Sequence, residues 1–418
     1  MKAPKNNNLN NNRDDDNNNC NVVVIERKNP DNNNNYKNYS NGGKEPLTET
    51  NYRISKERSK FDEFLLGYPR GAYTVARTIK RKAIVELEGH VNRICNSLQQ
   101  MKFTPSTENL TNGEHNDLNN NNNNNDNNNN RNKNKNKENN NINNNNNNNN
   151  KKDEKRKGEG EKGEDRGGEE KEAPNVTKEL EPYRNFDKLK EMIIPLLKMG
   201  LKKYYEIEEE TPYHIKGVDE ANITLLVCYS FKESRPILAA QIRPLRVPSS
   251  PKCKVDVYGE PRKSARTKDS QWVRDRKVFE KSMHPGFNEV ILTDPHTHNI
   301  YEGLSSNFFA VLHNPDTRQP LVVTAPLHCV LEGTIMKMVV MICNRDGIDF
   351  KFWFPNIEDI SQWKGAFITS TSRLVLPIEI MRFRDGRLME KLPTGDETII
   401  HIKNEVEKEI LNRAFRIL

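Results

Sequence analysis

The pattern of apolar positions separates stretches that can fold from stretches that cannot. Two stretches have too few apolar residues for a core: an Asn-rich segment over residues 1–60, and residues 107–173, where an Asn tract precedes a Lys/Glu/Gly tract. Neither can offset the chain entropy lost on folding, so we predict a disordered tail and a disordered insertion. We interpret the insertion as a tolerated surface loop, because closure entropy grows slowly with loop length; an interaction segment is the alternative.

The rest of the first half shows the two periodicities of regular structure. Val91, Ile94 and Leu98 share one helical face, and a broad apolar stripe follows residues 186–205. The elements predicted here are strands 71–79, 83–87, 223–229 and 237–242 and helices 90–101 and 186–205. We interpret residues 61–106 and 174–250 as one small N-terminal α/β domain that the insertion interrupts.

Residues 251–418 are interpreted as a larger C-terminal domain. The elements predicted here are strands 255–259, 289–294, 307–312, 321–324, 366–369 and 374–380 and helices 270–283, 334–343 and 397–416. Asp269 is the expected cap of the first of these helices, and Pro377 places its strand at a sheet edge. Strands interleaved with helices predict an α/β (α+β) fold.

Composition and charge exclude several classes of protein. The chain has 418 residues, 33% of them hydrophobic, and a formal charge of +7. We find no long Lys/Arg run and no stretch near the roughly 18 apolar residues of a membrane span, so neither a nucleic-acid nor a membrane partner is predicted. The start of the chain lacks the apolar core of a secretory signal. The six cysteines form no CxxC pair, so we expect no metal site, and buried reduced thiols in a cytoplasmic protein.

One octapeptide carries the chemistry. Glu302-Gly303-Leu304-Ser305-Ser306-Asn307-Phe308-Phe309 resembles the EGxSSNxF signature of class IV pyridoxal-phosphate (PLP) enzymes. That family includes branched-chain aminotransferases, D-amino-acid aminotransferase and aminodeoxychorismate lyase. The resemblance implies the fold-type IV architecture, with pyridoxal 5′-phosphate as cofactor. The alternative is a glutamate at a turn and a polar start to an ordinary strand.

The resemblance implies that Lys268 is the catalytic lysine. It stands upstream of the octapeptide, in Thr267-Lys268-Asp269-Ser270-Gln271-Trp272, where the family has the lysine that forms a Schiff base with the cofactor. Such a lysine must spend time as the neutral amine, which requires a lowered pKa, and a nearby helix N-terminus would favour this. A solvated surface lysine is the alternative.

The same resemblance assigns the other cofactor contacts. Glu302 is expected to keep the pyridine nitrogen protonated, and Arg93, in His90-Val91-Asn92-Arg93, to grip the phosphate. Glu332-Gly333-Thr334-Ile335 resembles the family's PGIT turn, whose two backbone N–H groups, here of Thr334 and Ile335, bind phosphate at a helix start. Glu332 replaces the proline there. Thr371 is the candidate threonine of the SGTxxE-like segment.

The residues on the substrate side leave the reaction open. Gly71 to Arg77 resembles the GCFTTAR opening of aminodeoxychorismate lyases, which form 4-aminobenzoate in folate biosynthesis, and we take the lyase as the lead. Gln241-Ile242-Arg243-Pro244-Leu245 resembles the YIRPL segment of branched-chain enzymes, where Arg243 would meet the carboxylate of a small amino substrate. A branched-chain or D-amino-acid type aminotransferase is therefore an alternative. A non-enzymatic Asn-rich scaffold is another. The family implies a homodimer.

Overall fold

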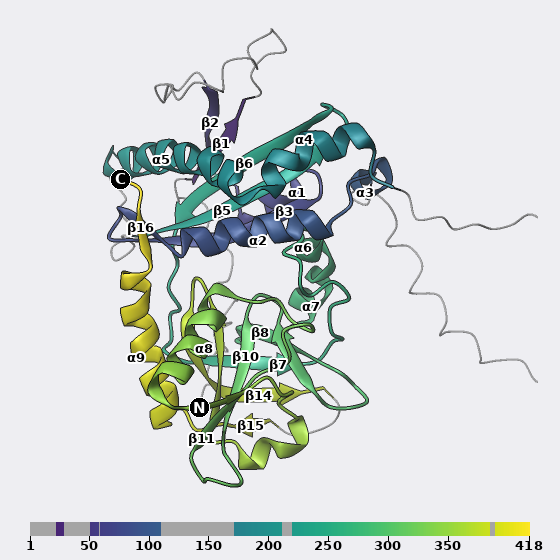
Figure 1. Cartoon of the computed structure of the whole chain (residues 1–418). Coiled ribbons are helices and arrows are strands. Elements are labelled where there is room, and N and C mark those ends of the chain that lie inside the picture. The colour runs from purple at the N-terminus through teal and green to yellow at the C-terminus, as the bar shows by residue number, and fades with distance from the viewer. Residues whose placement is uncertain (1–21, 29–50, 58, 110–170, 211–219, 385–388) are drawn as a thin grey trace, which may run out of the picture. The chain divides into compact units, whose positions relative to one another are not determined.

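Two β-sheets organise the folded chain (Figure 1). A computed structural model describes residues 22–28, 51–57, 59–109, 171–210, 220–384 and 389–418. One sheet is built from N-terminal strands together with the last strand of the chain, and the other from strands between residues 253 and 391. The link between them runs through residues 245–252, and we propose the domain boundary at this position.

The first sheet has seven strands. Their order is β16 (Ala414–Arg416), β4 (Ala83–Val85), β3 (Gly71–Ile79), β5 (Ala221–Ser230), β6 (Arg235–Pro244), β1 (Val22–Arg27) and β2 (Tyr52–Glu57). The four strands predicted for the N-terminal domain correspond to β3, β4, β5 and β6, and each prediction is confirmed within a few residues. The predicted disorder over 1–60 is wrong for β1 and β2. The four β-branched residues Val22 to Ile25 extend the sheet beyond β6 and are buried.

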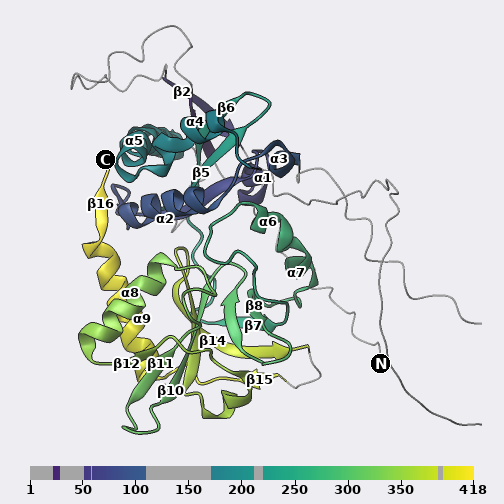
Figure 2. The same ribbon diagram turned by 45° about the vertical axis from the view of Figure 1, so that its right-hand side comes forward.

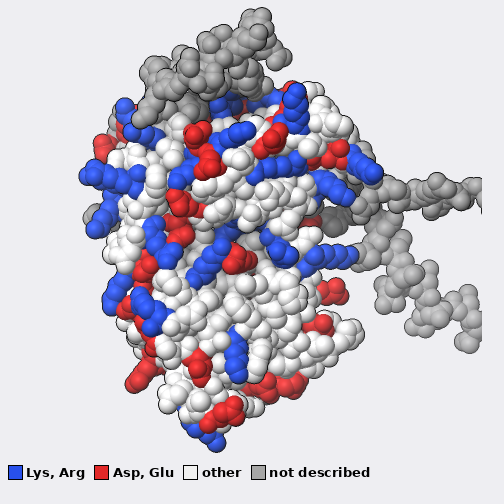
Figure 3. Space-filling model, viewed as in Figure 1, with Lys and Arg blue, Asp and Glu red and all other residues white. Residues whose placement is uncertain are grey.

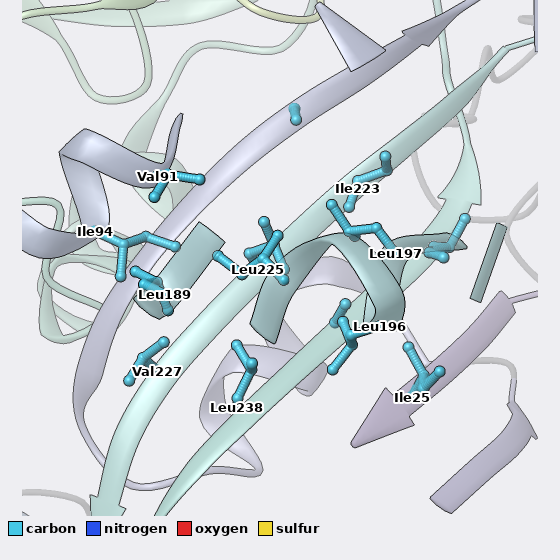
Figure 4. Close-up of a cluster of buried hydrophobic side chains, with 14 of the residues drawn as sticks. Ile25, Val91, Ile94, Leu189, Leu196, Leu197, Ile223, Leu225, Val227 and Leu238 are labelled. Atoms are coloured by element: carbon cyan, nitrogen blue, oxygen red, sulfur yellow. The ribbon is translucent and has the colours of Figure 1, made fainter. Parts of the chain in front are cut away.

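Helices cover both faces of this sheet. One face packs against α2 (Leu87–Gln100), α4 (Pro174–Arg184) and α5 (Phe186–Glu210); the other packs against α1 (Phe61–Leu66) and α6 (Gln271–Asp275). All ten residues of β5 are therefore buried. Figure 4 shows the first of these interfaces, where Ile223, Leu225 and Val227 meet side chains of α2 and α5. The two long helix predictions are confirmed, and α4 was not predicted.

The insertion prediction falls mainly on residues 110–170, outside the described residues. Its flanks are described. A short helix, α3 (Pro105–Asn109), lies on one side, and Glu172 on the other pairs with Arg184 of α4 at 2.8 Å.

The second sheet closes on itself. Its order is β12 (Asp349–Lys351), β11 (Pro320–Val323), β10 (Asn307–His313), β13 (Gly365–Ser370), β14 (Leu374–Phe383), β7 (Cys253–Val257), β8 (Glu289–Thr293) and β9 (Ile300–Gly303), with β15 (Glu390–Lys391) beside β14. Because Asn307 of β10 also pairs with Glu302 of β9, six of these strands form a closed barrel. The closing pair thus lies inside the octapeptide.

Two helices pack together on the outside of the barrel: α8 (Thr334–Asp346) and α9 (Glu397–Asn412) (Figure 2). Phe308 points to the barrel interior, whereas Phe309 lies under these helices and stacks on Phe367 with ring centroids 4.8 Å apart. The remaining elements are α7 (Lys277–Ser282) and the 3-10 helix η4 (Ile357–Gln362).

Three details differ from the sequence predictions. The helix predicted over 270–283 is two short helices, α6 and α7, and Ser270 is the cap residue, while Asp269 Oδ1 accepts the Gln271 N–H at 2.9 Å. Pro377 lies in an interior strand, because β14 exchanges partners there, pairing with β13 up to Pro377 and with β7 from Ile378. The last predicted helix ends at Asn412, and residues 414–416 form β16.

Four of the five cysteines among the described residues are buried, and no cluster of these residues has the composition of a metal site. In the described part of the chain no helix is long and apolar enough to cross a membrane. Lys and Arg alternate with Asp and Glu over the face in Figure 3, without a large patch of one sign.

The placement of β1 in the core gives a stability prediction. Ile25 is fully buried against α5, where a Cβ on Gly200 would lie 3.0 Å from Ile25 Cγ2. We expect Ile25→Ala to lower the free energy of unfolding by about 2–5 kcal/mol, measured by urea titration. Lys56→Ala, at an exposed position of β2, is the matched control and should change it by less than about 0.5 kcal/mol. Equal effects would show that β1 contributes nothing to the core.

Candidate active site

A single cavity of about 280 Å³ gathers every site residue predicted from the sequence. They come from six separate segments: Arg93, Arg243, Lys268, Glu302, Thr334 with Ile335, and Thr371. Five arginines, one lysine and one carboxylate line the cavity, so it is suited to an anionic ligand.

The main chain around Lys268 is pinned to the N-terminal sheet. The Lys268 carbonyl accepts the N–H of Tyr73 in β3 at 2.9 Å, and its own N–H donates to Ser97 Oγ of α2 at 3.0 Å. The Lys268 ammonium lies 5.1 Å from the centroid of the Tyr73 ring. Because these hydrogen bonds fix the main chain, the Lys268 side chain points into the cavity, where it is partly exposed.

Burial lowers the pKa of Lys268 well below 10.5, and the nearby cations Arg93, Arg262 and Arg276 lower this pKa further, against the opposing effect of Glu302. The sequence prediction of a lowered pKa is confirmed, but the expected cause is not the one found. The helix that follows has only five residues, and desolvation with three arginines takes the place of a helix dipole.

Glu302 is buried at the end of β9 and is held on both oxygens. Arg262 donates to Oε1 through Nε at 2.8 Å and Nη2 at 2.6 Å, and the Leu331 N–H donates to Oε2 at 3.1 Å. The side chain faces the same cavity as Lys268. A carboxylate in this position can accept a hydrogen bond from a protonated nitrogen of a ligand ring.

The start of α8 forms another side of the cavity. Gly333 is its cap residue, and no side chain caps the N–H groups that follow. A Cβ on Gly333 would collide with Asn307 Oδ1, so a larger residue at this turn would require Asn307 to shift. Arg93 Nη2 donates to the Glu332 carbonyl at 3.0 Å, which places a guanidinium beside the open helix start. Burial lowers the pKa of Arg93 to about 10.

The carboxylate of Glu332, which departs from the family motif, does not face the cavity. It is half exposed and pairs with Lys337 on the first turns of α8 at 3.0 Å. Only its backbone carbonyl takes part in the site, through Arg93. The replacement of proline by glutamate therefore leaves the open N–H groups of the turn available.

Arg243 lies in the cavity at the end of β6. Its guanidinium carbon is 5.3 Å from the centroid of the Phe61 ring, and its buried Nε has no hydrogen-bond partner in the described structure. Burial, together with repulsion from Arg246, lowers the pKa of Arg243 to about 10. Arg276 approaches the same ring at 5.9 Å. Among the described residues that line the cavity, none on this side is a carboxylate, although Glu280 pairs with Arg276 from outside the lining at 2.9 Å.

Sequence reasoning did not single out several lining residues. These include Phe61, Tyr73, Arg262, Arg276 and Thr369, whose buried Oγ1 has no partner in the described structure. No local signal marks Arg262 or Arg276 among the many basic residues of the loop. Gln241, weighed as a departure from the branched-chain pattern, binds Ser59 and Lys60 backbone oxygens instead of facing the cavity.

Comparison with known proteins agrees with this arrangement. Residues 206–380 match the family model of class IV aminotransferases. No curated protein matches the chain. Similar solved structures include a branched-chain aminotransferase from Thermoproteus uzoniensis with norvaline (13% identity, covering 88% of this chain and 97% of that one, TM-score 0.51). A fold IV transaminase from Curtobacterium pusillum is also similar (11%, 94% and 99%, TM-score 0.53). So is a putative branched-chain amino acid aminotransferase from Thermotoga maritima (16%, 93% and 96%, TM-score 0.50).

The fold is that of the fold-type IV enzymes, with a smaller N-terminal and a larger C-terminal domain. Residues 206–380, less than half of the chain, carry the similarity to class IV aminotransferases.

Proposed function

We propose that the chain is an aminotransferase that uses pyridoxal 5′-phosphate and Lys268 on a small amino acid that carries a carboxylate. One observation supports this above all: Lys268, with its lowered pKa, shares a cavity with a buried carboxylate and an open helix start. The solved relatives similar to this fold include transaminases.

The residues present fit the cofactor. The uncapped start of α8, at Thr334 and Ile335, together with Arg93 offers the N–H groups and the charge that a phosphate requires. Thr371 lines the same side, and the unpartnered Thr369 Oγ1 adds a hydroxyl that a ligand could engage. Glu302 would meet the ring nitrogen, and Lys268 would bind the aldehyde.

Bound pyridoxal phosphate supplies an electron sink that stabilises negative charge on the substrate carbon. The protein has to move a proton, and Lys268 Nζ is the group placed to accept it and to return it. Burial, together with the nearby cations Arg93, Arg262 and Arg276, lowers the pKa of Lys268 and so favours the neutral amine that this proton transfer needs. Glu302 stays fixed by Arg262 and the Leu331 N–H while this proton moves.

Arg243 is the proposed anchor of the substrate carboxylate, since its buried guanidinium has unused hydrogen-bonding capacity. We expect Arg243→Met to raise KM for the amino acid by roughly 10- to 100-fold, the loss of a charge-assisted contact of about 1.5–3 kcal/mol. Steady-state kinetics measure this. Arg243→Lys should recover part of the loss. An amine substrate without the carboxylate is the control, and a similar rise in its KM would contradict the assignment.

Aminodeoxychorismate lyase is the second candidate, supported by the Gly71 to Arg77 segment, whose β3 strand carries Tyr73 into the cavity. Product analysis separates the two reactions. Incubation with leucine and 2-oxoglutarate should yield glutamate if the aminotransferase proposal holds. Formation of 4-aminobenzoate from aminodeoxychorismate, with no glutamate from any tested amino acid, would replace it with the lyase.

A non-enzymatic scaffold would not need Lys268 and Glu302 in the same cavity. Purified full-length protein that stays colourless with added cofactor would restore it. We also propose a homodimer, on the family resemblance, to be tested by light scattering. We also propose a cytoplasmic location, which the burial of four of the five described cysteines fits.

A further inference from the structure

Arg262 and Glu302 form an ion pair almost closed off from solvent. Their side chains are 7% and 4% exposed, and two N–H groups of the guanidinium reach one carboxylate oxygen, Oε1. Arg262 is itself held in place. Its Nη2 also donates to the Ala265 carbonyl at 3.0 Å, and its Cζ lies 5.1 Å from the centroid of the Trp272 ring.

The hydrogen bonds to Glu302 leave one acceptor position open. A carboxylate offers about four lone-pair positions, two on each oxygen. Arg262 occupies both on Oε1, and the Leu331 N–H occupies one on Oε2. The remaining position is on Oε2. Arg262 thus determines which oxygen of Glu302 is available to a ligand in the cavity.

The location of the pair argues against a purely structural role. Burying two charges costs free energy that their attraction only partly returns, so a fold gains little from such a pair alone. Both Arg262 and Glu302 line the cavity. Another ion pair of the same barrel, Arg382 with Asp256 at 2.6 Å, does not line the cavity, and its arginine is more exposed, at 26%.

We propose that Arg262 is a positioning residue that orients Glu302 Oε2 toward the ring nitrogen of the cofactor and, by its charge, keeps the shared proton on that nitrogen. The inference rests on the proposed function. The guanidinium lies against the carboxylate and stabilises its ionised form more than it opposes charge on the more distant ring. Without Arg262, the buried carboxylate competes for the proton, and the ring becomes a weaker electron sink.

The test compares holoenzymes of the full chain: wild type, Arg262→Met, Arg262→Lys and the matched control Arg382→Met. NMR of cofactor labelled at the ring nitrogen reports its protonation directly. Arg262→Met should move this signal toward the unprotonated position and lower kcat by roughly 10- to 100-fold, as loss of an orienting partner typically does. Arg262→Lys keeps the charge but not the two hydrogen bonds to Glu302. Its ring-nitrogen signal and its kcat should lie between those of wild type and Arg262→Met.

The outcomes are distinguishable. Wild-type protein that binds no cofactor overturns the proposed function itself. If wild type binds it, but Arg262→Met and Arg382→Met both keep the wild-type ring-nitrogen signal, the role of Arg262 is overturned and the function stands. Should Arg262→Met fail to fold, Arg262→Lys decides: an intermediate signal supports the inference, and a wild-type signal with wild-type kcat overturns it.

Discussion

Lys268→Ala should lose covalently held cofactor and lower turnover by roughly 10³-fold or more, since the same amine serves as attachment point and as general base. Borohydride reduction of the wild-type holoenzyme should leave the cofactor on the peptide that contains Lys268. The variant should release its cofactor on dialysis and carry no label. Mass spectrometry of the digested protein and visible absorbance measure both results.

Lys263→Ala is the matched control, because Lys263 belongs to the same loop but is exposed. It should keep the label and the turnover of wild type. The pH profile gives a second check. Activity that needs the neutral amine is lost as pH falls through the pKa of Lys268, and this pKa lies well below 10.5. The acid limb of kcat should therefore lie below the range of an ordinary lysine. An unaltered label in Lys268→Ala would refute the assignment.

Local patterns predicted most of the fold where apolar residues recur within one element. Helix α8 and strands β3, β5 and β10 carry their own periodicity. The missed elements depend on neighbours distant in sequence. The run Val22–Ile25 is surrounded by asparagines, and it becomes a strand because β6 offers it a partner and α5 covers it. Pro377 has an edge-strand signal, which the exchange of partners along β14 overrides.

The site shows the same division. Glu302, Lys268 and the Gly333 turn sit in short motifs whose residue types reflect their chemistry, so they could be found from the sequence. Arg262 and Phe61 could not. Arg262 is one of several basic residues in its loop, and Phe61 lies in a short helix within the segment predicted to border the disordered tail. Their places follow from tertiary packing, which brings both to the cavity.

Glu302→Ala is expected to impair both stability and catalysis. It leaves Arg262 as an unpaired charge with an exposed fraction of 7%, and breaking such a buried pair costs about 3–5 kcal/mol of unfolding free energy. It also removes the carboxylate proposed for the ring nitrogen, so turnover should fall by about 10²-fold or more, as for loss of one preorganised electrostatic group. Urea unfolding of the apoprotein and steady-state kinetics of the holoenzyme measure the two effects separately.

Glu302→Gln and Glu332→Ala separate the causes. Glutamine keeps an acceptor for Arg262 but no charge, so it should recover part of the stability and little of the turnover. Glu332 is half exposed, and its pair with Lys337 should contribute less than about 1 kcal/mol. If Glu302→Ala unfolds at the same urea concentration as Glu332→Ala, then the Arg262–Glu302 pair does not hold the barrel together at its closing strand. If the turnover of Glu302→Ala also equals that of Glu332→Ala, the carboxylate of Glu302 has no part in the chemistry. The resemblance of the octapeptide would then extend to the fold alone.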